Sequence, residues 1–261
     1  MRTIYSLFLA LLLFASCFEK SPAGPDWGDF TPTPEPEKPE QFTTQYIEPT
    51  TVVAPVGSQI AGLRFYPGIS INIAQKNFAA RLADISSAGF KYIEITIKHG
   101  YGIKDKSDET VLADFSTVLS QVKALGLTIW SIHLPFDDSN WTNPGGKESI
   151  RRQSVDYLNR VMRLCAAGFP ECKNYVLHAS KGTLSPRSES VAQARKSLAE
   201  MIPVAKELGV RICVENLVGS LCPTTEEMAA TIDGVEDAWV TYDIGHAHCV
   251  GQDVVTFLKW I

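Results

Sequence analysis

Four segments of the chain repeat one order of elements, and this repetition limits the fold more than any other feature of the sequence. In each segment a helix-like pattern ends at a glycine and an apolar strand-like run follows almost at once: AGFKYIEI, LGLTIWSIH, AGFPECKNYVLH and LGVRICVEN. The segments recur roughly every 40 residues, the spacing of a strand joined to its helix. Apolar strands separated by amphipathic helices predict a parallel sheet with helices packed against it.

Six strand–helix units can be assigned along the chain. The expected strands are 68–73, 92–97, 128–134, 175–177, 211–214 and 239–242, and the expected helices are 77–88, 110–125, 147–167, 190–208, 225–232 and 253–261. The even spacing of the helix-to-strand junctions favours a (β/α) barrel of the TIM type, and an open doubly wound sheet is the alternative. The nucleotide-binding signatures GxGxxG and GxxxxGK[ST] are absent. Because a TIM barrel has eight units, we expect an α/β barrel with about six of eight units, cut short at its carboxyl end by fragmentation, gene truncation or a split protein.

The first 17 residues predict an export signal that is not part of the fold. Arg2 precedes a short apolar run, 4–15, which is too short to span a bilayer stably. The FASC motif, which ends at Cys17, resembles the lipidation signal of bacterial lipoproteins. We therefore expect an exported, membrane-anchored lipoprotein, with an ordinary cleaved signal as the alternative.

A proline-rich, acidic stretch separates this signal from the folded domain. Residues 18–62 contain TPTPEPEKPE and few apolar side chains. Such a stretch cannot bury enough apolar surface to fold, and proline keeps it extended. The sequence therefore predicts a tether over 18–62 and an incomplete barrel over 63–261.

Net charge and cysteine content restrict the possible partners and disulfides of the protein. The formal net charge is −5, with 24 Lys and Arg against 29 Asp and Glu, and this argues against a nucleic-acid partner. Five cysteines follow Cys17, so at least one has no partner within the domain. Export permits disulfides, and Cys165 with Cys172, on either side of a helix-to-strand turn, is the pair we expect if one forms.

All five histidines of the sequence fall at or just beyond the carboxyl end of an expected strand. His99 follows the second strand, His133 lies in the third, His178 follows the fourth, and His246 and His248 follow the sixth. In parallel α/β folds the functional residues gather at this end of the sheet. A single histidine there can also simply hydrogen-bond a loop, which is the plainer interpretation for His99 and for His248.

Two carboxylates at strand ends give the strongest functional signal. Glu215 follows ICV and precedes Asn216, and Asp243 follows WVTY. A carboxylate that follows an apolar strand so closely is costly to bury unless it is paired or bound to a metal. With His246 three residues further on, the two carboxylates predict part of a site for Mn²⁺, Mg²⁺ or Zn²⁺.

The series WSIHLPF, YVLHAS, ICVENL and TYDIGHAH resembles the sugar phosphate isomerase/epimerase superfamily. This group of xylose isomerase-like TIM barrels also includes endonuclease IV, and the resemblance covers about 68–261. In such enzymes a Glu after strand five, an Asp after strand six, a His after strand seven and a Glu after strand eight hold the metal. Glu215 and Asp243 match the first two, and the last two have no counterpart here. His246 matches the histidine that contacts substrate in epimerases or a second metal in the endonuclease, and His178 resembles the strand-four histidine near the site.

This resemblance implies a metal-dependent isomerase or epimerase that acts on a carbohydrate by proton transfer through an enediolate. Glu215 is expected as base and metal ligand, Asp243 as metal ligand and His246 as a catalytic group. Contact with the small-molecule sugar is expected from His99, His133, His178, Asn216 and His248. An endonuclease IV-like metal-dependent hydrolase is one alternative, and a non-catalytic, lipid-anchored carbohydrate-binding barrel is another.

Overall fold

The computed structural model describes residues 59–60, 63–64, 67–136, 138 and 140–261. The predicted signal segment 1–17, with Cys17, and the tether up to residue 58 lie outside the described residues, so lipidation and export stay predictions. The described helices include none that combines the length and the apolar character needed to cross a bilayer.

Six parallel strands form the main sheet, in the order β3-β4-β5-β6-β7-β8. The strands are β3 (Gly68–Asn72), β4 (Tyr92–Thr96), β5 (Thr128–His133), β6 (Asn174–Leu177), β7 (Arg211–Glu215) and β8 (Ala238–Thr241). Each strand therefore pairs with its neighbours in sequence, as in a (β/α) barrel. A separate antiparallel pair, β1 (Gln59–Ile60) with β2 (Leu63–Arg64), spans the predicted domain boundary.

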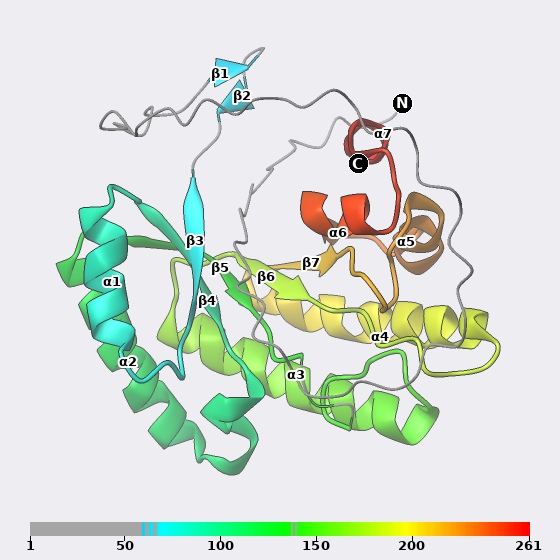
Figure 1. Ribbon diagram of the computed structural model, residues 1–261. Coiled ribbons are helices and arrows are strands. Elements are labelled where there is room, and N and C mark those ends of the chain that lie inside the picture. The colour runs from blue at the N-terminus through cyan, green and yellow to red at the C-terminus, as the bar shows by residue number, and fades with distance from the viewer. Residues whose placement is uncertain (1–58, 61–62, 65–66, 137, 139) are drawn as a thin grey trace, which may run out of the picture. The chain divides into compact units, whose positions relative to one another are not determined.

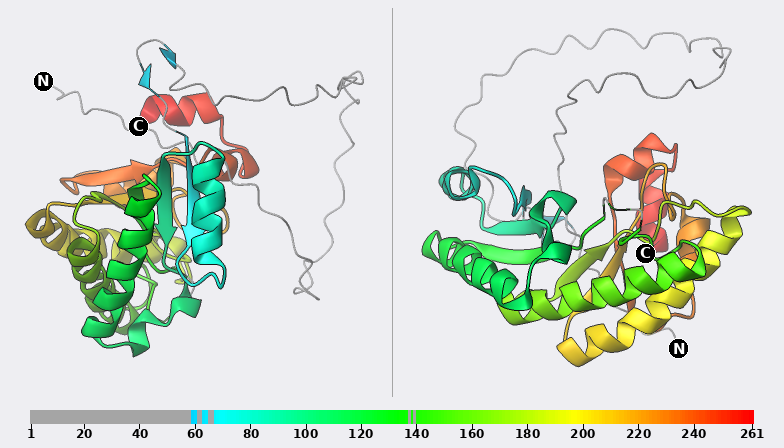
Figure 2. Two further views of the ribbon diagram at one scale, coloured as in Figure 1. Left: turned by 90° about the vertical axis from the view of Figure 1, so that its left-hand side faces the viewer. Right: turned by 90° about the horizontal axis from the view of Figure 1, so that it is seen from below.

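Each strand of this sheet is followed along the chain by one or two helices. They are α1 (Phe78–Ser87), α2 (Asp108–Ala124), α3 (Glu148–Gly168), α4 (Arg187–Leu208), α5 (Thr225–Ile232), α6 (Ile244–Cys249) and α7 (Val254–Trp260), with 3-10 turns η1 (His99–Tyr101) and η2 (Ile103–Asp105). From α1 to α5, each helix packs against the next, and Figures 1 and 2 show α1 to α4 arranged along the outer side of the strands.

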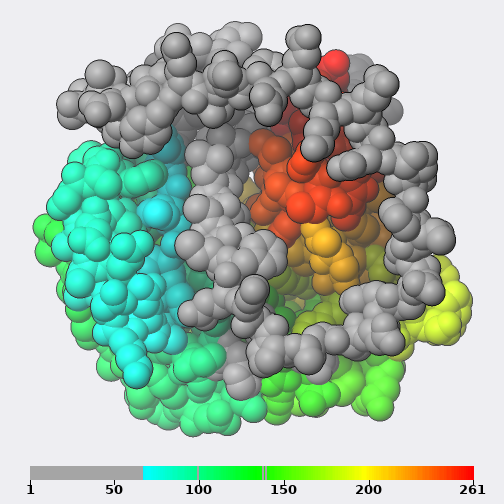
Figure 3. Space-filling view, viewed as in Figure 1, coloured from blue at the N-terminus to red at the C-terminus, as the bar shows by residue number. Residues whose placement is uncertain are grey.

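The expected fold, a TIM-type α/β barrel with six strand–helix units, is confirmed. Among the described strands β3 and β8 pair on one side only, so they are the edges of an open, partial barrel. Figure 3 shows the first unit, in cyan, and α6, in red, on opposite sides of the view, as the two ends of such a sheet should be.

The two faces of the sheet differ in chemistry, and this difference positions the site. On β4, Ile93 and Ile95 are at most 1% exposed and belong to the hydrophobic core. Glu94 and Thr96 alternate with them, so they lie on the other face, where they are also buried. TIM barrel interiors are usually filled by Val, Ile and Leu, so a carboxylate here indicates a polar barrel interior.

The cysteines of the domain are free thiols, so the expected Cys165–Cys172 disulfide is wrong. Cys165 lies within α3, and Cys172 precedes β6, where its Sγ donates to the Asn174 carbonyl at 3.8 Å. Burial raises the pKa of both thiols, that of Cys172 to about 12. Both side chains are thus protonated and pack as small apolar groups.

Ser107 is the N-cap of α2, because its Oγ accepts a hydrogen bond from the Thr110 N–H at 3.3 Å. Ser107→Ala is expected to lower the free energy of unfolding by about 1 kcal/mol, since this N–H loses its partner. Ser116→Ala, on the exposed face of the same helix, should change it by less than about 0.5 kcal/mol. Urea unfolding measures both values, and equal losses in the two variants would contradict the capping role.

Candidate metal and proton-transfer site

Side chains from four neighbouring strand ends meet at the carboxyl edge of the sheet. His133 is the last residue of β5, His178 follows β6 and Glu215 is the last residue of β7. Asp243 and His246 follow β8 at the start of α6. The strands pair in register up to these positions, so five polar side chains distant in sequence become neighbours.

Glu215 is the centre of this group and is only 4% exposed. Its Oε2 atom faces two imidazoles, His133 Nε2 at 3.1 Å and His178 Nε2 at 3.0 Å. Its Oε1 atom lies 3.7 Å from His246 Nδ1, beyond hydrogen-bond distance. One carboxylate oxygen is therefore fixed by two histidines, and the other remains available on the side of Asp243 and His246.

His133 and Glu215 form a buried ion pair. The Nδ1 atom of His133 lies 2.9 Å from the Leu134 carbonyl oxygen, which only accepts, so Nδ1 carries a proton. Burial alone would lower the pKa of His133, but the hydrogen bond and charge of Glu215, with a contribution from Glu94, raise it to about 9. Burial likewise favours neutral Glu215, yet its hydrogen bonds with His133 and His178 hold its pKa far below the ordinary value. Glu215 is therefore ionised at neutral pH.

His178 is a neutral donor to the same oxygen. Burial lowers its pKa, and the hydrogen bond to Glu215 offsets this only in part. The Phe136 ring packs against both imidazoles, with ring centroids 4.6 Å from His133 and 4.5 Å from His178. The Lys98 ammonium lies over Phe136 at 5.8 Å from the ring centroid. This aromatic contact restricts both rings that orient Glu215.

Asp243 and His246 are held by a short helix that the sequence patterns did not predict. Asp243 is the N-cap of α6, and its Oδ1 accepts from the His246 backbone N–H at 2.7 Å. Its Oδ2 lies 3.6 Å from the His246 Nδ1. That Nδ1 is 2.8 Å from the Asn216 carbonyl oxygen, an acceptor only, so Nδ1 donates there. When the ring is neutral, Nε2 is thus the atom that carries the lone pair.

Two groups of side chains could hold a metal ion. One is His133, His178 and Glu215, and the other is Glu215, Asp243 and His246, with one ligand atom per residue within 4.8 Å of the others. In the first group both histidine nitrogens that face Glu215 are already used as donors to its Oε2. The second group offers two carboxylates, which suit Mn²⁺, Mg²⁺ or Zn²⁺. The donor set therefore fits a divalent cation held by Glu215 and Asp243.

The remaining predicted site residues are distributed less tightly. His99 lies in η1, beyond the carboxyl end of β4, and His248 is exposed on α6. His248 belongs to neither of the two groups of possible metal ligands, and the side chain of His99 lies outside the described part of the structure. Asn216 is fully buried, and His133 and His178 contact Glu215. Sugar contact by these five residues stays a prediction.

Glu94 is a site residue that the sequence interpretation missed. It is 2% exposed, and its Oε2 accepts from the Ser131 Oγ at 2.8 Å. Its Oε1 is buried with no hydrogen-bond partner among the described residues. The register pairs Glu94 with Ser131 and, two residues on, Thr96 with His133, so Glu94 lies one layer below the site. Burial raises its pKa, and the available signal was a Glu between isoleucines inside an otherwise apolar strand.

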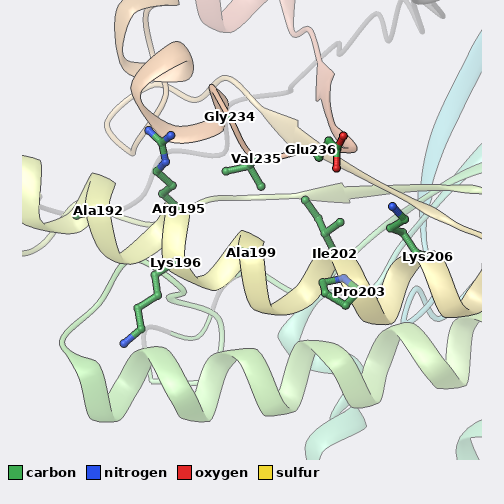
Figure 4. A pocket seen from close by; sticks show the side chains of 10 residues that line it. All are labelled: Ala192, Arg195, Lys196, Ala199, Ile202, Pro203, Lys206, Gly234, Val235 and Glu236. Carbon is green, nitrogen blue, oxygen red and sulfur yellow. The ribbon is translucent and has the colours of Figure 1, made fainter.

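A separate cavity of about 550 Å³ lies outside the barrel, between α4 and the turn before β8 (Figure 4). It is at the amino end of β8, whereas Asp243 follows its carboxyl end. The cations around this cavity are already engaged, since Lys206 pairs with Asp237 at 2.7 Å and Lys196 with Glu148 at 3.1 Å. This cavity thus contributes nothing to the carboxylate and histidine group.

Solved structures with the same fold include sugar epimerases. A D-tagatose 3-epimerase-like protein is 17% identical, with a TM-score of 0.58 over 73% of this chain and 70% of that chain. The D-psicose 3-epimerase of Clostridium cellulolyticum, solved with D-tagatose, is 15% identical, with a TM-score of 0.59 over 73% and 68%. The 3-keto-D-glucoside 4-epimerase of E. coli is 17% identical, with a TM-score of 0.54 over 71% and 70%.

Sequence comparison assigns the family. No curated protein sequence matches the chain significantly. The family model for the xylose isomerase-like TIM barrel matches residues 82–259, which is more than half of the chain and includes every strand end that builds the site. The order of the strands agrees with that match, and the chain belongs to the xylose isomerase-like TIM barrel family.

Proposed function

We propose that the protein is a metal-dependent sugar isomerase or epimerase that moves a proton at a carbon next to a carbonyl group. The observation that carries this proposal is the placement of Glu215. It is ionised, buried and held through one oxygen by His133 and His178, while its other oxygen lies on the side of Asp243. The family and the sugar epimerases among the structural relatives support the same reaction class.

The residues of the site divide the work between binding and proton transfer. A divalent cation held by Glu215 and Asp243 would supply polarisation of the carbonyl and hydroxyl oxygens of an open-chain sugar. Glu215 would take the proton from the carbon, because the two imidazoles hold its buried carboxylate ionised. His246 would accept a hydrogen bond from a sugar hydroxyl through Nε2, since its Nδ1–H is bound to the Asn216 carbonyl. The product of the first step is an enediolate.

Exchange of a substrate C–H with solvent tests this function directly. A single base suffices for exchange. Glu215 removes the proton from the substrate carbon, exchanges it with solvent and returns a solvent-derived proton to the same carbon. The chain with Mn²⁺ and a ketohexose such as D-tagatose or D-fructose in deuterated water should incorporate deuterium next to the carbonyl, as observed by NMR. Chelation of Mn²⁺ should stop it.

Metal and sugar binding separate the alternatives. A non-catalytic carbohydrate-binding barrel would bind sugars without exchange and without metal, and a hydrolase would cleave a phosphodiester instead. The proposed enzyme should bind about one Mn²⁺ per chain. Tight Mn²⁺ binding without exchange across a panel of ketoses and aldoses would refute the isomerase proposal.

A further inference from the structure

Asn216 makes an unusual set of hydrogen bonds directly after β7. Its side chain is fully buried, and both of its polar atoms contact the backbone of Asp243. Nδ2 donates to the Asp243 carbonyl oxygen at 2.9 Å, and the Asp243 N–H donates to Oδ1 at 2.7 Å. Because one contact requires a donor and the other an acceptor, the orientation of the amide is fixed.

The amide of Asn216 continues the sheet beyond its last strand pair. The parallel pairing of β7 with β8 ends at Glu215 and Thr241. One residue beyond Glu215, the Asn216 side chain binds the N–H and C=O of Asp243 in place of a backbone peptide. The two predicted metal ligands, Glu215 and Asp243, are therefore joined by one backbone step and two hydrogen bonds.

The main chain of Asn216 acts on the third member of the group. Its carbonyl oxygen accepts from His246 Nδ1 at 2.8 Å. This contact selects the ring tautomer in which Nε2 is unprotonated. One buried residue thus fixes the backbone of Asp243 through its side chain and the imidazole of His246 through its main chain.

We propose that Asn216 is a positioning residue for the cation and proton-transfer site, and not a sugar ligand. Its side-chain amide holds Asp243 at the distance from Glu215 that a shared divalent cation requires. Both amide atoms contact the backbone of Asp243, and the side chain is fully buried, so a sugar hydroxyl does not reach it. This inference rests on the proposed metal-dependent function, and it assigns to the side chain a role that metal binding reports without any turnover.

Two substitutions of Asn216 test the role of the amide. Asn216→Asp keeps the shape but turns the donor into an oxygen that repels the Asp243 carbonyl. Asn216→Leu removes both hydrogen bonds without adding charge, and it serves if a buried carboxylate prevents folding. Loss of a group that orients a metal ligand typically weakens metal binding about 10- to 100-fold. We therefore expect Mn²⁺ affinity to fall by this factor in both variants. Electron paramagnetic resonance of free Mn²⁺ measures the affinity.

Asn174→Asp is the matched control. Asn174 begins β6, at the opposite end of the sheet, and its Nδ2 also donates to a backbone carbonyl, that of Trp130, at 3.0 Å. This variant loses an amide-to-carbonyl hydrogen bond far from the site, and it should bind Mn²⁺ like the wild type.

The outcomes separate the inference from the proposed function. If the wild type binds Mn²⁺ and a folded Asn216 variant binds it equally well, the positioning role is overturned. If Mn²⁺ affinity is unchanged but the dissociation constant for the sugar rises, Asn216 is a sugar ligand and the inference is again overturned. If the wild type itself binds no divalent cation, the proposed function fails, and the inference fails with it.

Discussion

Glu215→Gln is expected to reduce deuterium exchange at the substrate carbon by about a thousandfold or more and to abolish tight Mn²⁺ binding. The variant replaces the ionised carboxylate at the centre of the group by an amide. Gln cannot take a proton from carbon, and its amide is a much poorer ligand for a hard cation than a carboxylate. One substitution causes both losses, because Glu215 belongs to both groups of possible metal ligands.

Glu226→Gln provides the control for this substitution. Glu226 is exposed in the first turn of α5 and belongs to neither group of possible ligands, so exchange and Mn²⁺ affinity should be unchanged. NMR of the sugar measures exchange, and circular dichroism confirms that each variant is folded. Exchange retained by a folded Glu215→Gln variant would show that another group is the base.

The fold was predictable because its determinants are local. Four strands follow a helix end marked by glycine, and Gly209 does end α4 in the left-handed conformation, with φ of 65°. Gly168 serves a different purpose at the equivalent place. It is the last residue of α3, and a Cβ there would lie 2.7 Å from the Phe115 side chain. The pattern thus located the junction correctly, although close packing and not backbone conformation requires this glycine.

The site was predictable only in outline, because its contacts join residues distant in sequence. Strand-end positions identified Glu215 and Asp243, but no spacing reveals that His133 and His178 both bind one oxygen of Glu215. The expected strand before Asp243 was found, while α6 was missed, since six residues are too few for a helical pattern to stand out. Glu94 was overlooked because apolar neighbours on both sides make a strand position look like core.

The buried His133–Glu215 pair should make the stability of the metal-free protein depend on pH. The folded pKa of His133 is about 9, above its ordinary value of 6.5. Its contribution is therefore complete below about pH 6.5 and is lost as the pH rises through 9, on the order of 3 kcal/mol in total. Glu215, with a lowered pKa, contributes stability above its ordinary pKa that is lost in acid. The lowered pKa of His178 removes stability as the pH falls below the ordinary value of 6.5, so the free energy of unfolding should be greatest near pH 6.5.

His133→Gln isolates the alkaline part of this dependence. Gln can still donate one hydrogen bond to Glu215, but it has no proton to lose between pH 6.5 and 9. The buried cysteines also have raised pKa values, so their contribution to the free energy of unfolding falls as the pH rises. This contribution is common to both proteins. The difference between wild type and variant in urea unfolding with a chelator, followed across this range, therefore reports His133 alone. A wild-type stability that stays as flat as that of the variant would mean that His133 is neutral in the folded protein, and that Glu215 carries its charge without an ion pair.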